Sequence, residues 1–117
     1  MSRRRFEHAM ERMRADEPKA REDGFDFLRE HADAYVDDLV TEFTAGRRDH
    51  VDDHGLRCRL LELIAEARSA TALDLFRDQA RSDDESLRFW AVRGLEMLDS
   101  REAEQALDEA RADGWIP

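Results

Sequence analysis

Apolar residues along this chain recur at steps of three and four positions, the spacing of one face of an α-helix. The clearest stretch follows residue 83, and its apolar positions are Leu87, Ala91, Gly94, Leu95 and Leu98. The next stretch follows Ser100, and its apolar positions are Ala103, Ala106, Leu107 and Ala110. The pattern therefore predicts two successive amphipathic helices, and no alternating strand pattern competes with it.

The same arrangement occurs twice earlier in the chain. The pair of stretches after residue 52 has the apolar-face positions Leu56, Leu60, Leu63, Ile64 and Ala67, then Ala72, Leu75, Phe76 and Gln79 or Ala80. The pair after residue 16 has Ala20, Gly24, Phe27, Leu28 and His31, then Val36, Leu39, Val40 and Phe43. A shorter stretch precedes all three pairs, with Phe6, Ala9, Met10 and Met13. Seven helices are therefore expected.

A polar hexad that ends in arginine precedes each pair: DEPKAR at 16–21, DDHGLR at 52–57 and DDESLR at 83–88. The copies begin 36 and 31 residues apart, and a period of this length is typical of stacked helix pairs. Residues suited to N-capping stand at the expected helix starts, namely Asp33, Asp52, Ser69, Asp83 and Ser100. We therefore predict one all-α domain over residues 1–117, with a capping helix over 1–15, repeats over 16–44, 52–80 and 83–112, and a tail over 113–117.

The hexads and stripes resemble the short type of HEAT-like repeat. The resemblance rests on Leu87-Arg88, Ala91, Gly94-Leu95, Glu102-Ala103 and Ala106-Leu107, and one copy earlier on Leu56-Arg57, Leu63-Ile64 and Leu75-Phe76. It implies an α-solenoid of about three helix pairs that is used for protein recognition, and it implies no activity. It also implies a structural ladder in which Arg21, Arg57 and Arg88 each face the acidic turn of a neighbouring repeat.

The charge of the chain narrows the choice of partner. The formal net charge is −10, and because residues 1–15 carry +3, the remainder carries −13. Such a body repels phosphate backbones, so a nucleic-acid ligand is not expected, whereas a basic protein partner is favoured. A second explanation is compositional, because a GC-rich or salt-adapted genome would also favour acidic residues and eighteen arginines beside one lysine.

Localisation signals are few. The single cysteine, Cys58, excludes an internal disulfide and fits a reducing cytoplasm. Arg3, Arg4 and Arg5 are followed by a polar stretch, so we expect no signal peptide, and we also expect no membrane span. These arginines could contact the acidic body or an acidic partner.

Candidate catalytic and metal-binding residues are weakly supported. His50, His54 and Cys58 stand four residues apart, which would place two imidazoles and a thiol on one helix face. The cap expected at Asp52 breaks that helix, however, and no second cluster supplies another ligand, so we predict neither a metal nor a cofactor. The serines fall at helix starts, where capping explains them, and His31 is expected to be a packed histidine. We therefore predict a non-enzymatic protein.

Two sets of residues are candidates for partner binding. Second helices of HEAT-like pairs line the concave face, which gives three outward rows: Asp38, Asp74 and Gln105; Thr41, Arg77 and Asp108; Glu42, Asp78 and Glu109. The second set is aromatic, because Phe89 and Trp90 depart from the Cys58 and Arg59 that occupy equivalent positions one repeat earlier. For Trp90 an internal role is also open, in which the tail Trp115-Ile116-Pro117 folds over it.

These observations predict a non-catalytic protein-binding module. Small acidic HEAT-like proteins resemble bacterial immunity proteins, which occupy the active site or nucleic-acid surface of a toxin, so a toxin-neutralising role through an acidic concave face is the specific hypothesis. One alternative is a scaffold or regulatory subunit that binds or self-associates through its last repeat, giving a homo-oligomer. Another is a lyase-like accessory factor, because some short HEAT-like proteins resemble bilin-attachment factors.

Overall fold

The fold is all-α, as the pattern predicts. The computed structural model describes residues 3–48 and 54–117, and within these ranges it contains seven α-helices and no strand. The helices are α1 (Arg3–Met13), α2 (Pro18–Glu30), α3 (Val36–Arg48), α4 (His54–Ala67), α5 (Leu73–Gln79), α6 (Glu85–Leu98) and α7 (Arg101–Ala112). Two 3₁₀ turns, η1 (Ala32–Ala34) and η2 (Ala70–Ala72), precede α3 and α5.

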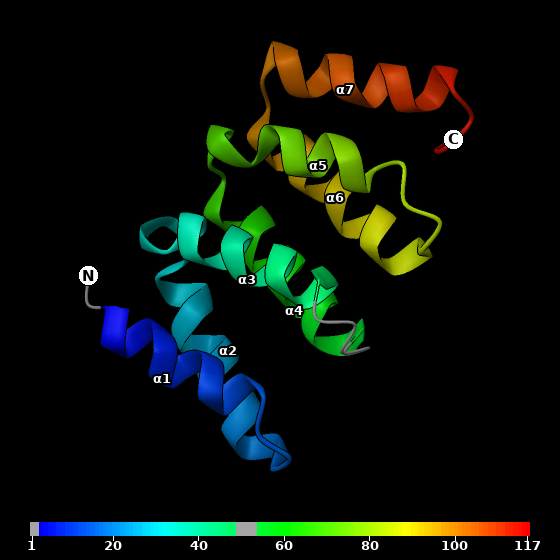
Figure 1. Cartoon of the computed structure of the whole chain (residues 1–117). Helices are drawn as coiled ribbons and strands as arrows, with labels where there is room; N and C mark the ends of the chain where they lie inside the picture. The colour runs from blue at the N-terminus through cyan, green and yellow to red at the C-terminus, as the bar shows by residue number, and fades with distance from the viewer. Residues whose placement is uncertain (1–2, 49–53) are drawn as a thin grey trace.

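The helices pack in an order that follows the sequence. Helix α1 packs on α2, α3 on α4, and α5 on α6, while α4 also packs on both α2 and α6 (Figure 1). Helix α7 contacts α5 and α6 at the far end of the molecule from α1. Most packed pairs are thus consecutive or next-but-one helices, and α4 occupies the centre.

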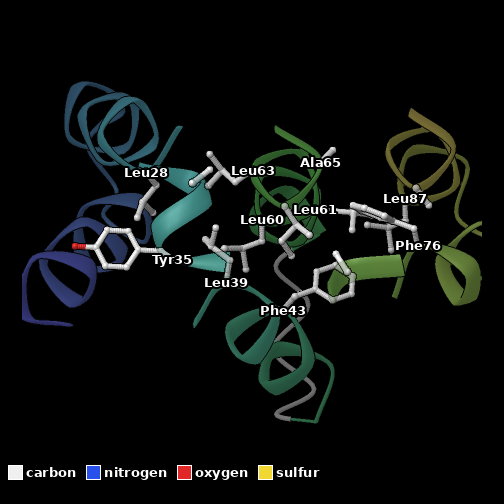
Figure 2. Packing of buried hydrophobic residues seen from close by; sticks show 14 of the residues in the cluster. Leu28, Tyr35, Leu39, Phe43, Leu60, Leu61, Leu63, Ala65, Phe76 and Leu87 are labelled. Carbon is white, nitrogen blue, oxygen red and sulfur yellow. The ribbon is translucent and has the colours of Figure 1, made fainter. Parts of the chain in front are cut away.

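The hydrophobic core runs through the molecule by way of α4. Figure 2 shows Leu28, Tyr35 and Leu39 on one side of Leu60 and Leu61, with Phe76 and Leu87 on the other. The predicted stripe of α1 is fully confirmed, since Phe6, Ala9, Met10 and Met13 are all buried, and so is the predicted stripe of α7. The apolar periodicity therefore locates most of the core correctly.

Helix α4 is buried more widely than a single stripe predicts. Leu61 and Ala65 are buried beside the predicted Leu60, Leu63 and Ile64. The reason is that α4 is packed against other helices on several sides. More of its surface is therefore buried than in a helix at the edge of the molecule, which buries a single stripe. At its ends, Leu56 and Ala67 are only half-buried.

Two predicted caps are confirmed. Ser100 begins α7, and its hydroxyl accepts a hydrogen bond from the Ala103 amide at 3.1 Å. Ser69 likewise accepts from the Thr71 amide at 3.3 Å, although the element that it begins is the turn η2 rather than α5 itself.

Two other predicted caps are wrong, and one lies outside the described residues. The cap of α6 is Asp84 rather than Asp83, because Asp84 has the extended backbone of a cap and its Oδ1 accepts from the Leu87 amide at 2.9 Å. Asp33 lies inside η1, and α3 begins three residues later at Val36. The intervening Tyr35 is buried with its ring 5.3 Å from that of Phe6, so packing decides where α3 begins. Asp52 falls outside the described residues.

Two of the three hexad arginines contact turns of the fold. Arg21 donates to the carbonyl oxygen of Ala15 at 3.4 Å, and Arg88 donates to that of Ser82 at 2.8 Å. Both acceptors lie six residues before the arginine, so the first and third hexads are structurally equivalent at this position. These acceptors belong to the turns that precede the arginines themselves rather than to an acidic turn of a neighbouring repeat. The guanidinium of Arg57 lies 4.2 Å from the centre of the Phe43 ring.

Within the described residues, none of the helices has both the length and the hydropathy that crossing a membrane requires.

Candidate functional site

The acidic residues predicted on α3 are held by arginines of α1. Arg3 forms an ion pair with Asp38, and Arg14 Nη2 lies 2.5 Å from Glu42 Oε2. Both carboxylates are therefore partly neutralised within the chain. The basic character of residues 1–15 is consistent with ion pairs to the acidic remainder of the chain. The sequence does not specify which carboxylates are paired, because the pairing depends on how α1 crosses α3.

The predicted positions on α5 and α7 are mixed in charge. Glu109 lies 3.9 Å from Arg77, and Asp108 lies 3.1 Å from Arg111. Asp74 and Gln105 are exposed, and so is Asp78, which accepts a hydrogen bond from Gln79 at 3.2 Å. The predicted rows therefore carry arginine partners at several positions, and Asp74 on α5 is an exposed acidic position among them.

The aromatic pair lies on α6 and divides between core and surface. The rings of Phe89 and Trp90 meet edge to face, with their centroids 5.0 Å apart. Trp90 is half-buried and packs against the core, whereas Phe89 is 57% exposed. Among the residues that the structure describes, Phe89 is the exposed large hydrophobic side chain.

The tail folds back on α7. The Trp115 amide donates to the Ala110 carbonyl at 2.9 Å, Arg111 donates to the Pro117 carbonyl at 3.2 Å, and Trp115 and Ile116 are half-buried against the core. Arg81, which follows α5, pairs with Asp113 at 2.5 Å and fixes this end of α7 beside the α5–α6 connection. The tail therefore covers apolar surface at the end of the helix stack, whereas Phe89 is exposed.

A His-Cys-Asp cluster joins α4 to the start of α6. His54 is the first residue of α4, Cys58 lies one turn later, and Asp84 is the cap of α6. The His54 Nε2 lies 2.6 Å from Asp84 Oδ2 and 3.5 Å from Cys58 Sγ. One ligand atom from each of these three side chains lies within 4.8 Å of the other two.

The surroundings of this cluster set its charge. The pKa of Asp84 is lowered, mainly because its carboxylate accepts a hydrogen bond from the Leu87 amide. The nearby His54 lowers this pKa further. Burial, with the nearby Asp84 carboxylate, raises the pKa of the Cys58 thiol, and Arg57 partly opposes this effect. Asp84 is therefore anionic at neutral pH, whereas Cys58 is a thiol.

A groove of about 510 Å³ is lined by His54 and Asp84 of the cluster. Its walls carry charges of both signs, from Arg57, Arg81, Asp78, Asp83 and Asp84. The predicted candidates His54 and Cys58 are thus brought together, while His50 falls outside the described residues. Sequence reasoning missed Asp84 as their companion. The repeat gives a signal for it, because Asp84 belongs to the hexad that follows the hexad containing His54.

His31, the remaining candidate, is half-buried with its ring centroid 4.7 Å from that of Phe27, as expected of a packed histidine. Comparisons of the chain with protein-family models, curated proteins and solved structures find no match.

Proposed function

We propose that this chain is a non-catalytic protein-binding module, and that the exposed Phe89 anchors its partner. Exposing a phenylalanine to water forfeits about 1.5–3 kcal/mol that burial would provide. Phe89 is held edge to face on a half-buried Trp90, so its position is set before a partner arrives. A pre-positioned aromatic side chain of this kind is typical of an interface hot spot, because little entropy is lost when it is covered.

The architecture that we propose is an α-solenoid of about three HEAT-like pairs, with α1 as its capping helix. The contacts of α4 with both α2 and α6, and of α5 with α7, support it. The equivalent hydrogen bonds of Arg21 and Arg88 also support it, because they recur at the same position of two hexads.

The partner that we propose is a basic protein, and specifically a toxin that this chain neutralises. The net charge of −10 supports a basic partner, since complementary charge accelerates encounter. The ion pairs of Asp38 and Glu42 with α1 move the expected contacts toward α5, where Asp74 is exposed. A scaffold that self-associates through α6 is the second candidate, and the same exposed Phe89 favours it.

Site-specific photocrosslinking tests this proposal. A photoreactive benzoylphenylalanine replaces Phe89 in one variant and the exposed Asp26 of α2 in a control, and both are expressed in the source organism. We expect position 89, and not position 26, to crosslink to one basic protein, with less crosslinking in the Asp74→Arg, Asp78→Arg background. Crosslinking to a second copy of the chain would support the scaffold instead. Absence of a crosslink specific to position 89 would overturn both.

If a basic partner is recovered, its toxicity decides the specific role. Expression of the partner alone should arrest growth, and co-expression of this chain should restore it. Growth that is unaffected by the partner alone would refute toxin neutralisation and leave protein binding as such intact.

A further inference from the structure

The cluster of His54, Cys58 and Asp84 combines side chains that zinc prefers. A thiolate, an imidazole nitrogen and a carboxylate oxygen are the three donor types found in protein zinc sites. Their ligand atoms already lie within 4.8 Å of one another without any ion between them. Two come from one turn of α4 and the third from the cap of α6, so the fold itself brings them together.

Two of the three distances between ligand atoms are close to those of a tetrahedral zinc site, and the third, from sulfur to the carboxylate oxygen, is within 4.8 Å. With Zn–S near 2.3 Å and Zn–N and Zn–O near 2.0–2.1 Å, tetrahedral angles place sulfur about 3.5 Å from nitrogen and nitrogen about 3.3 Å from oxygen. The observed Sγ–Nε2 distance is 3.5 Å, so that pair is already in position. The His54–Asp84 contact, at 2.6 Å, must open by roughly 0.7 Å. Both side chains are partly exposed and can rotate by that amount.

The two oxygens of Asp84 have separate partners. Oδ1 accepts from the Leu87 amide at 2.9 Å and caps α6, whereas Oδ2 faces His54. An ion that binds Oδ2 therefore leaves the cap in place. The cap in turn fixes the orientation of the carboxylate, which is the role that outer hydrogen bonds have in established metal sites.

The charge balance of the cluster suits a divalent cation. Zn²⁺ displaces the proton of the Cys58 thiol to solvent, so the resulting thiolate and the Asp84 carboxylate together neutralise the ion, and a neutral imidazole completes three ligands. Arg57 and Arg81 line the same groove and oppose a cation, while Asp78 and Asp83 favour one. The groove side of the cluster provides access for the ion and space for water as a fourth ligand.

We propose that His54, Cys58 and Asp84 bind one Zn²⁺, with a water molecule from the groove as the fourth ligand. The ion connects the start of α4 to the start of α6. It therefore stabilises the folded chain, because an unfolded chain does not hold Asp84 near the other two ligands. This site is independent of the partner-binding proposal, which depends on Phe89.

Cobalt substitution tests the site in the full-length protein. Metal-free protein is titrated with Co²⁺, and we expect one equivalent to produce the near-ultraviolet charge-transfer band of thiolate-bound cobalt. Zn²⁺ should then displace the cobalt and abolish the band. Because Cys58 is the single cysteine of the chain, the band reports this site alone. Absence of the band would overturn the proposal.

Single-residue variants test whether zinc is bound by all three side chains or by His54 and Cys58 alone. Asp84→Asn keeps a good capping side chain but removes the anionic ligand, and Asp83→Asn is the matched control in the same groove. We expect Asp84→Asn and His54→Gln each to weaken Zn²⁺ binding at least about tenfold, and Asp83→Asn, which removes a nearby charge but no ligand, to weaken it much less.

Equal zinc affinity of Asp84→Asn and the unsubstituted protein would overturn the assignment of Asp84 as a ligand. Thermal unfolding gives a second readout. Saturating zinc should raise the unfolding temperature of the unsubstituted protein and of Asp83→Asn, with a smaller rise for Asp84→Asn. If zinc raises none of these temperatures, the proposed link between α4 and α6 is wrong.

Discussion

Replacing Gly24 by alanine should separate α1 from α2. A Cβ built on Gly24 would lie 2.5 Å from the carbonyl oxygen of Ala9 and 3.0 Å from the backbone nitrogen of Met13. Ordinary contact begins at 3.4 Å, so α1 must move away by about 0.9 Å. The nearest atom belongs to the backbone of α1, and no side-chain rotation relieves the contact.

The expected cost follows from two opposing effects. Alanine is better than glycine inside a helix by about 1 kcal/mol. Overpacking a close interface costs about 1–3 kcal/mol, and a backbone neighbour puts this contact at the upper end of that range. We therefore expect Gly24→Ala to lower the free energy of unfolding by about 1–2 kcal/mol.

Urea unfolding followed by circular dichroism measures this change. Asp26→Ala is the control, because Asp26 is exposed on the same helix and alanine there changes helix propensity without adding a contact. We expect the control to be neutral or slightly stabilising.

Gly94 provides a contrast within the same chain. A Cβ on Gly94 would lie 2.6 Å from ring atoms of Phe76, which is a side chain rather than backbone. Gly94→Ala should therefore be less destabilising when Phe76 is leucine than when it is phenylalanine. If Gly24→Ala proves as stable as the unsubstituted protein, the close approach of α1 to α2 is wrong, and so is the capping role that we give to α1.

Three further predictions concern single side chains. Ser100→Ala should lower the free energy of unfolding by about 1 kcal/mol in urea unfolding, because the cap of α7 is lost, and no change would refute the capping role. Burial raises the pKa of Glu62, so its charged form is disfavoured in the folded state, and Glu62→Gln should stabilise the protein at pH 7. That gain should decrease as the pH falls through the raised pKa and disappear below the ordinary value of 4.5, where the carboxyl group is protonated in both the folded and unfolded states. A gain that persists in unfolding curves at lower pH would contradict this cause. Arg14→Ala should cost less than about 1 kcal/mol in low salt and less still in high salt, because its pair with Glu42 is partly exposed; a salt-independent cost would indicate lost packing instead.

Most of the helices follow from local pattern. Helix α7 is the clearest case, because it lies at the edge of the molecule and buries one stripe, so periodicity alone identifies Ala103, Ala106, Leu107 and Ala110. Helix α4 shows the limit of that reasoning. Its burial of Leu61 and Ala65 depends on how many helices surround it, which is a property of the whole fold.

The candidate sites depend even more on tertiary contacts. Asp83 and Asp84 are equally suited to capping by type, and only the backbone conformation decides between them. The same choice places Asp84 beside His54 and Cys58, so the third ligand cannot be read from a spacing within one helix. The pairing of Asp38 and Glu42 with arginines of α1 likewise requires the crossing of two helices. The exposed Phe89 is different, because its departure from the repeat is visible in the sequence.

We propose that Phe89 anchors a protein partner, and the dissociation constant of the complex between this chain and the partner recovered by crosslinking tests this directly. It should be measured by calorimetry for the unsubstituted chain, for Phe89→Ser and for Arg93→Ala, which changes an exposed residue one turn further along α6. We expect Phe89→Ser to weaken binding at least about tenfold, since hot-spot side chains contribute 2 kcal/mol or more, and Arg93→Ala to have a much smaller effect. A dissociation constant that is the same for Phe89→Ser and the unsubstituted chain would contradict the claim.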